Sequence, residues 1–302
     1  MGQPFIDLAR RGLNAWWRYL LSFTMIVFGW ILLGSLLGGL VIVVLLALTR
    51  PEAFTGDAAP ELTDVDPLIA FAGANAQFIM LLVSVVLAVT IVHRRPILTL
   101  ITTRPSFDWG RAAQGFGLWL VLVALASLVE ALLYPGRYQL TVNLVELIKF
   151  LPLALVLTPI QTTAEELFVR GYLLQWVGLI VRIPIAAVVL TSLLFMSLHW
   201  ANPEMELSPI LMGASYLGFG LLAGLCTLRD NRMELALGLH AGNNLFSWLV
   251  VNYTASPLSS PSLFTSQLEP AYSLVSFVAM AVVFYLVVFH VLGKEEAAAS
   301  RT

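Results

Sequence analysis

The chain has 302 residues, of which 59% are hydrophobic and only 11% charged, whereas a water-soluble domain carries charge on about a quarter of its residues. The formal net charge of -2 excludes a protein that gathers nucleic acid on a basic surface. The single cysteine, Cys226, excludes an intramolecular disulfide and a thiolate metal site. This composition is typical of a protein that crosses the membrane several times.

The N-terminal stretch 1–18 is predicted to be an amphipathic helix at the membrane interface. It combines three arginines with Trp16 and Trp17, and indole rings prefer the level of the lipid headgroups. The apolar run that follows is much longer than a signal-peptide core and ends without a small-residue cleavage pattern. We therefore expect it to remain as the first membrane span.

Eight apolar segments follow one another along the chain, each long enough to cross ~30 Å of hydrocarbon. The segments are too long and too uniform for barrel strands, so they predict helices. The predicted fold class is an all-α polytopic membrane helix bundle with about eight transmembrane helices, one domain over 19–292, and a polar tail at 293–302. The segments are 19–49, 68–92, 112–134, 144–164, 184–200, 207–228, 233–253 and 270–292.

Basic residues predict the orientation of this bundle. With eight spans, the arginines of 94–111 and of 229–232 fall on the same side as both termini, while the loop 50–66 on the opposite side carries five acidic residues. Because cytoplasmic loops are enriched in lysine and arginine, we expect both termini to face the cytoplasm.

Ionisable side chains within spans indicate where function could lie, because each costs several kcal/mol unless it is paired or hydrated. In the run Glu165-Glu166-x-x-x-Arg170, Glu166 and Arg170 share a helix face and can pair, whereas Glu165 is turned away by about 100°. A free carboxylate in a low-dielectric cavity suits a general base. Taken alone, the motif is equally compatible with a structural pair and a second glutamate that faces water.

Two further motifs favour a single site. Phe195-x-x-x-His199 places an imidazole at the end of an apolar helix, and His240-x-x-x-Asn244 places an imidazole and an amide on one helical face. These are two of only four histidines in the chain, so we expect them to converge with Glu165. The other ionisable groups are interpreted as local pairs or interfacial side chains, namely Glu130, Glu146 with Lys149, His93 and His290.

The spacing of the motifs tests this convergence. If the fourth helix continues to a turn at Arg182, then Glu165 lies 17 residues before the turn and His199 lies 17 residues after it. His240 is only eight residues from Arg232, which corresponds to about 12 Å along a helix, whereas the 17 residues between the turn and Glu165 or His199 correspond to about 25 Å. His240 can lie at the same depth as Glu165 and His199 only if the hairpin protrudes into the cytoplasm or the helices tilt strongly.

The three motifs, in this order, resemble the CPBP family of intramembrane metalloproteases, which groups type II CAAX prenyl endopeptidases with bacteriocin-processing and immunity proteins. The resemblance covers about 80 residues and predicts a catalytic region at about 144–253. It implies that Glu165 and His199 activate a water, that His240 and Asn244 stabilise the oxyanion, and that Glu166 and Arg170 support them.

The resemblance also implies partners and a location. The substrate would be a membrane-anchored peptide or protein, of which a prenylated CAAX-type chain is one option, and the protein would lie in the bacterial inner membrane. No cofactor is required by the motifs. Zinc held by Glu165, His199 and His240 is an open alternative, although the His-Glu-x-x-His pattern is absent.

Two rival interpretations remain at this stage. A transporter or ion-binding bundle also places carboxylates and histidines in mid-membrane, but it would be expected to show inverted repeats in both halves, and here the polar groups gather in one half. A non-catalytic immunity or scaffold protein on the same fold would carry the same motifs.

Overall fold

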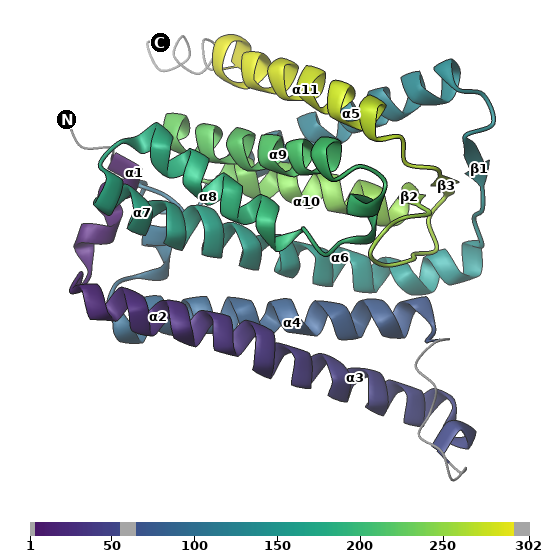
Figure 1. Ribbon diagram of the computed structural model, residues 1–302, viewed down its shortest axis with the longest axis horizontal. Helices are drawn as coiled ribbons and strands as arrows, with labels where there is room; N and C mark the ends of the chain where they lie inside the picture. The colour runs from purple at the N-terminus through teal and green to yellow at the C-terminus, as the bar shows by residue number, and fades with distance from the viewer. Residues whose placement is uncertain (1–3, 55–64, 293–302) are drawn as a thin grey trace.

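The computed structural model describes residues 4–54 and 65–292, and these ranges are mostly helical (Figure 1). The predicted all-α fold class is therefore confirmed. The predicted polar tail at 293–302 lies outside the described residues. The α-helices in chain order are α1 (Pro4–Asp7), α2 (Trp16–Phe28), α3 (Gly34–Thr49), α4 (Pro67–Leu87), α5 (Trp109–Leu133), α6 (Leu144–Glu166), α7 (Leu174–Val181), α8 (Pro184–Leu198), α9 (Pro209–Asp230), α10 (Glu234–Leu249) and α11 (Pro270–Leu286).

π-helical turns lengthen several of these helices. They join α2 to α3 and α6 to α7, and they extend α4 and α11. The turns are Gly29–Leu33, Leu167–Leu173, Ala88–Val92 and Val287–Leu292. Six of the resulting helices are long and apolar enough to cross a membrane, namely Trp16–Thr49, Pro67–Val92, Trp109–Leu133, Leu144–Val181, Pro209–Asp230 and Pro270–Leu292. The chain is an integral membrane protein.

The predicted count of about eight spans is not confirmed within the described ranges. The fifth and seventh predicted segments correspond to α8 and α10, which have 15 and 16 residues. At 1.5 Å per residue they reach only about 22–24 Å, less than the ~30 Å of hydrocarbon. The fifth segment ends early because a 3-10 turn at Pro203–Glu206 follows His199.

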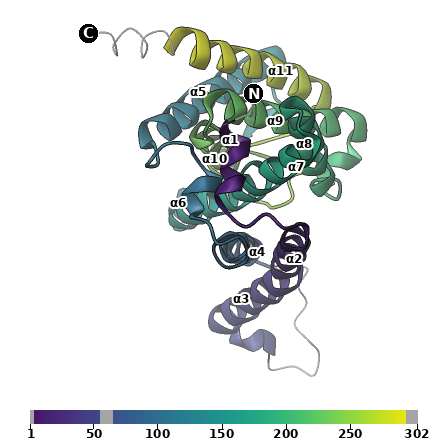
Figure 2. The same ribbon diagram turned by 90° about the vertical axis from the view of Figure 1, so that its left-hand side faces the viewer.

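The long helices run side by side in layers (Figure 1). The pair α2–α3 and the helix α4 form one edge of the molecule, α5 and α11 lie at the other, and α6, α8, α9 and α10 fill the space between them. Viewed along the helices, α10 lies inside the bundle (Figure 2). It contacts α5, α6 and α9, and almost every side chain from Glu234 to His240 is buried.

The N-terminal segment differs from the single amphipathic helix predicted over 1–18. It consists of α1 and a 3-10 turn, Leu8–Arg11, and the next helix begins only at Trp16. Phe5 and Ile6 are buried in a cluster with Leu174 of α7. These apolar side chains therefore pack against protein. The position of this N-terminal segment at the membrane interface stays a prediction.

The loops that carry most of the arginines meet at one end of the bundle, where α1 and the α7–α8 turn also lie (Figure 1). There Arg232 binds Asp108 at 2.6 Å and Asp230 at 2.9 Å, and Arg111 binds Asp230 at 2.9 Å. Asp108 begins α5 by accepting the backbone N–H of Arg111, which holds the pKa of this carboxyl below its usual range. The network ties α5 to the α9–α10 turn. Which side of the membrane this end faces stays a prediction.

A small sheet closes the opposite end. Its strands are β1 (Tyr138–Leu140), β2 (Val251–Tyr253) and β3 (Phe264–Ser266), in the order β1–β3–β2. β1 is antiparallel to β3, with Gln139 opposite Thr265, and β2 is parallel to it. The sheet connects the loop before α6 to the loop that follows α10.

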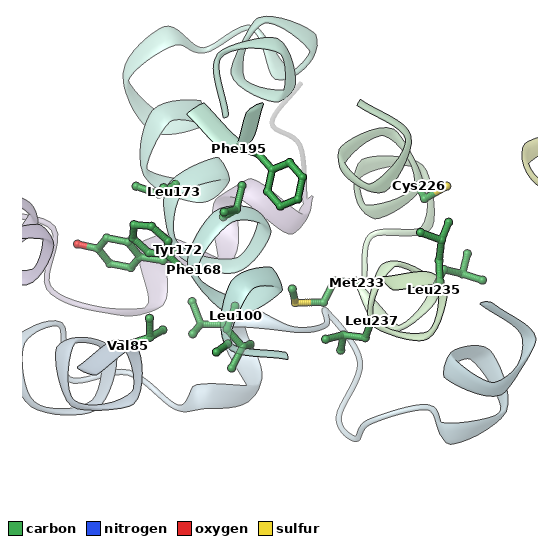
Figure 3. Close-up of a cluster of buried hydrophobic side chains, with 14 of the residues drawn as sticks. Val85, Leu100, Phe168, Tyr172, Leu173, Phe195, Cys226, Met233, Leu235 and Leu237 are labelled. Carbon is green, nitrogen blue, oxygen red and sulfur yellow. The ribbon is translucent and has the colours of Figure 1, made fainter. Parts of the chain in front are cut away.

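The largest apolar cluster surrounds the π-helical turn between α6 and α7. Every residue of Leu167–Leu173 is buried, and Phe168 and Tyr172 pack within a cluster that also includes Phe195 of α8 and Leu235 of α10 (Figure 3). Burial of a large apolar side chain stabilises the fold by about 1.5–3 kcal/mol. The segment that directly follows Glu165 and Glu166 is therefore held on all sides.

Glycines allow the closest helix contact, between α5 and α10. A Cβ atom at Gly238 would lie 2.0 Å from the carbonyl oxygen of Ala112, and one at Gly115 would lie 2.4 Å from that of Leu235. Because backbone faces backbone, neither neighbour can rotate away. Glycines also allow close contacts between other helices, since Gly38 of α3 faces the backbone of Gly73 of α4 and Gly220 of α9 faces Ser192 of α8.

Gly238→Ala is expected to destabilise the bundle by about 1–3 kcal/mol, because α10 must move away from α5. Gly117→Ala on α5 is the matched control, since a Cβ there meets nothing within 4 Å and alanine is the better helix former by about 1 kcal/mol. Thermal unfolding in detergent checks the pair. Equal melting midpoints for the two variants would contradict the close contact.

Candidate active site

A single cavity of about 300 Å³ brings the three sequence motifs together. Glu165 of α6, His199 at the end of α8, and His240 and Asn244 of α10 all line it. The hairpin geometry proposed from the spacing also holds, because the helix that carries Glu165 continues to Val181, and Arg182 and Pro184 make the turn into α8. Catalytic roles for these residues stay a prediction.

The two adjacent glutamates occupy different environments. Glu166 is fully buried, and its Oε1 accepts hydrogen bonds from Arg170 and from Nδ1 of His240, both at 2.8 Å. Glu165 retains 9% exposure and accepts only a long 3.4 Å bond from Gln161, while its Oε2 has no hydrogen-bond partner among the described residues. One carboxylate is thus fixed by two short bonds, and the other is held by a single long bond.

A π-helical turn begins directly after these glutamates, at Leu167. Such turns are rare, and they occur often at functional sites because they reorient side chains within a helix. This one contains Arg170, whose guanidinium is buried and lies 4.4 Å above the ring of Phe195. The ion pair is therefore placed behind the cavity, in contact with the helix that carries His199.

His240 is fixed in one ring orientation. Because Glu166 is paired with Arg170 and acts as an acceptor, Nδ1 of His240 must carry the hydrogen of their 2.8 Å bond. Its Nε2 lies 3.8 Å from Oε2 of Glu165, beyond hydrogen-bond range. Nε2 can thus donate only when the ring is protonated on both nitrogens. This coupling of His240 to the supporting glutamate is not predicted by the motif spacing.

His199 is also held through Nδ1. This nitrogen bonds the carbonyl oxygen of Phe195 at 2.8 Å, so it carries the hydrogen and Nε2 keeps its lone pair. The ring lies between the ring of Phe195, at 4.5 Å, and that of Tyr216, at 4.3 Å and nearly parallel. Nε2 is therefore left as an acceptor in a fixed place.

Asn244 is oriented by a chain of hydrogen bonds across two helices. Trp119 of α5 donates to Asn243 at 3.2 Å, and the amide nitrogen of Asn243 donates to Oδ1 of Asn244 at 3.1 Å. Since Oδ1 of Asn244 is engaged, its NH₂ group is the part left for another acceptor. The motif spacing does not indicate that Asn243 and Trp119 take part.

The cavity contains further polar groups that the sequence did not assign to it. Glu130 forms the expected local pair, with Arg137 at 2.8 Å, and also binds Tyr138 at 2.6 Å, but it lines the cavity as well. Glu146 and Lys149 form their expected pair at 2.8 Å. The cavity lining that no motif pointed to includes Gln161, Asn202, Glu204, Tyr216 and Glu269.

The geometry does not fit the metal site considered from the sequence. Among residues 4–54 and 65–292, no three His, Cys, Asp or Glu side chains are close enough together to hold one metal ion. Glu165, His199 and His240 line the same cavity without forming such a group. We therefore derive the chemistry from the side chains alone.

Comparisons with known proteins point to the same family as the motifs. Residues 147–246 match the family described as type II CAAX prenyl endopeptidase Rce1-like. A relative from Bacillus subtilis (strain 168), "Uncharacterized protein YyaK", is 33% identical over 256 residues, which cover 84% of this chain and 84% of the relative. No solved structure matches the chain.

The matched segment contains the whole set of motif residues, from Glu165 on α6 to Asn244 on α10, and the cavity lies in an integral membrane helix bundle. Similarity over most of the chain extends beyond this segment to the helices that carry no motif. The chain therefore belongs to the CPBP family, the family of Rce1-like type II CAAX prenyl endopeptidases.

Proposed function

We propose that the protein is an intramembrane endopeptidase that hydrolyses a peptide bond of a membrane-anchored substrate with a water activated by Glu165 and His199. The observation that carries the proposal is the cavity of about 300 Å³ lined by an unpartnered carboxylate oxygen, two histidines fixed through Nδ1 and an oriented amide. The family supports a CAAX-type protease, and a prenylated chain is one such substrate.

The first step removes a proton from water. Oε2 of Glu165 lacks a partner among the described residues, and Nε2 of His199 keeps its lone pair, so both can accept hydrogen bonds from the same water. As the water oxygen attacks the carbonyl carbon, its proton passes to this pair. General-base assistance contributes about 10²–10⁴ to the rate. The proton then moves to the leaving amine as the peptide bond breaks.

The second requirement is a set of donors for the charge that develops on the carbonyl oxygen. The NH₂ group of Asn244 is one donor. Nε2–H of a doubly protonated His240 is the other, with Glu166 accepting from Nδ1 on the opposite side of the ring. Each such donor is worth about 2.7–4 kcal/mol. Glu166 and Arg170 thus act on the reaction through His240.

Cleavage of labelled peptides in H₂¹⁸O tests the proposal. Purified protein in lipid nanodiscs would be incubated with peptides anchored by a prenyl or an acyl chain, and hydrolysis predicts one ¹⁸O in the new carboxyl group of the N-terminal product and none in the product that gains the new amine. His199→Ala is expected to lower the rate by about 10²–10⁴, and Asn244→Ala by about 10²–10³ with little change in KM.

The matched control is His290→Ala, because His290 is exposed on the last turn after α11 and does not line the cavity. It should cleave at the wild-type rate. A transporter or a non-catalytic protein predicts no labelled carboxyl group from any of these samples, and that outcome with both anchor types would refute the proposal.

A further inference from the structure

Three polar residues lie next to His199 and outside the family motifs. Asn202 and Glu204 belong to the short segment that follows α8, and Tyr216 belongs to α9. All three line the cavity. Tyr216 stacks on the imidazole of His199, with ring centroids 4.3 Å apart and an interplanar angle of 25°. One face of the His199 imidazole is thus covered by the ring of Tyr216, which carries a hydroxyl group.

The tyrosine hydroxyl is bound to a buried carboxylate. Tyr216 donates its hydroxyl hydrogen to Oε1 of Glu204, while the amide of Asn202 donates to the hydroxyl oxygen at 3.0 Å and to Oε1 at 3.1 Å. Glu204 is only 7% exposed, and its Oε2 has no hydrogen-bond partner among the residues described. A buried carboxylate is costly, and this one is retained beside the ring that stacks on His199.

We propose that Glu204, through the hydroxyl of Tyr216, is a positioning residue that fixes His199 and stabilises the positive charge that its imidazole gains when it takes a proton from water. The inference rests on the proposed hydrolase function. It concerns residues beyond the motifs, whose contacts arise only because α9 folds back against the end of α8.

The physical argument has two parts. A cation over an aromatic face is attracted by the electron density of the ring. A hydroxyl that donates to a carboxylate is more polarised than one that donates to water, so the ring of Tyr216 becomes a better partner for imidazolium. The fixed geometry matters as well, because the stack and the bond from Nδ1 to Phe195 together leave His199 one orientation.

The other charges around His199 come from three elements. Glu165 lies on α6, His240 lies on α10, and both line the same cavity. Arg170 lies over the ring of Phe195 at 4.4 Å, but it is paired with Glu166 at 2.8 Å. With that pair neutral overall, Glu165 and Glu204 are the negative charges beside His199, and the doubly protonated His240 of the proposed mechanism is a positive one. Removing the charge of Glu204 should therefore make the imidazole harder to protonate.

The experiment compares Glu204→Gln and Tyr216→Phe with wild type in the dependence of kcat/KM on pH. In Glu204→Gln the acidic limb, along which His199 becomes protonated and can no longer act as a base, should move to lower pH by about 0.5–1 unit. Without the charge of Glu204 the imidazole binds its proton less tightly, so a lower pH is needed to protonate it. The plateau should fall by about two- to tenfold, because the weaker base accepts the proton of water less readily. Tyr216→Phe keeps the stack and should shift the limb in the same direction.

Glu206→Gln is the matched control, because Glu206 lies two residues further on the same 3-10 turn and is exposed. Its profile should superimpose on that of wild type. If wild type and Glu206→Gln cleave the peptide and the acidic limb of Glu204→Gln and Tyr216→Phe does not move, the inference is wrong while the proposed function stands.

The titration of His199 can also be followed without turnover. Protein labelled at histidine ¹³Cε1 has four such resonances, and loss of one signal in His199→Gln identifies that of His199. Its titration midpoint should move to lower pH in Glu204→Gln and in Tyr216→Phe, and stay in place in Glu206→Gln. An unchanged midpoint in folded Tyr216→Phe and Glu204→Gln would overturn the inference even for a protein without detectable cleavage.

Discussion

Glu165→Gln is expected to lower the rate of peptide cleavage by about 10²–10⁴, because the substitution removes the carboxylate that, together with His199, accepts the proton of water. The fold should be retained. A glutamine has the same volume, its oxygen can still accept the 3.4 Å bond from Gln161, and the other oxygen of Glu165 has no hydrogen-bond partner to lose among the described residues. The cleavage rate and the melting midpoint in detergent would be measured on the same preparation.

Glu269→Gln is the matched control for this change. Glu269 also lines the cavity, and its two carboxylate oxygens cap α11 by accepting the backbone N–H groups of Ala271 and Tyr272, one each, so an amide oxygen keeps one of the two bonds. The charge of the cavity changes by the same amount, but the rate should stay within a few-fold of wild type. Full activity in Glu165→Gln would exclude this glutamate as the base.

Glu166→Gln is expected to act chiefly on stability. The substitution leaves the buried guanidinium of Arg170 without a counter-charge, and breaking a buried ion pair in this way costs about 3–5 kcal/mol. The 2.8 Å bond to Nδ1 of His240 is weakened as well, so activity should fall together with the melting midpoint. In Glu165→Gln, by contrast, activity should fall alone.

Two comparisons separate the ion pair from other effects of the Glu166 substitution. The double variant Glu166→Gln/Arg170→Met removes both charges and should recover much of the lost stability, since an apolar replacement of a buried pair is often neutral. Glu146→Gln breaks the exposed pair with Lys149 and should leave the melting midpoint almost unchanged, because solvent screens such a pair. A loss in Glu146→Gln as large as in Glu166→Gln would show that burial does not set the cost.

Much of the site could be predicted because helical spacing relates residues close in sequence. The pairing of Glu166 with Arg170 follows from their separation by four residues, and the hairpin that brings His199 level with Glu165 follows from equal distances to the turn at Arg182. The hydrophobic runs likewise indicated helices in a membrane. These predictions depend on local geometry and on composition, both of which are present in the sequence.

The remaining features depend on which helices become neighbours. Spacing along α10 cannot reveal that His240 bonds Glu166, nor that Trp119 of α5 orients Asn243. Nothing in the sequence of the segment after His199 indicates that Glu204 binds the hydroxyl of a tyrosine on α9. The count of about eight spans is likewise not confirmed among the described residues, because α8 and α10 have only 15 and 16 residues.

The small size and polar character of α10 have a consequence for biosynthesis. A translocon releases segments into lipid one after another according to their hydrophobicity, and ionisable residues at a helix centre oppose release. With 16 residues that include Glu234, His240 and Asn244, α10 is poorly suited to enter the bilayer on its own. It is expected to enter only after α5 and α6 have been made and can cover it. Insertion of the helix that carries His240 and Asn244 would then depend on its packing against these two helices.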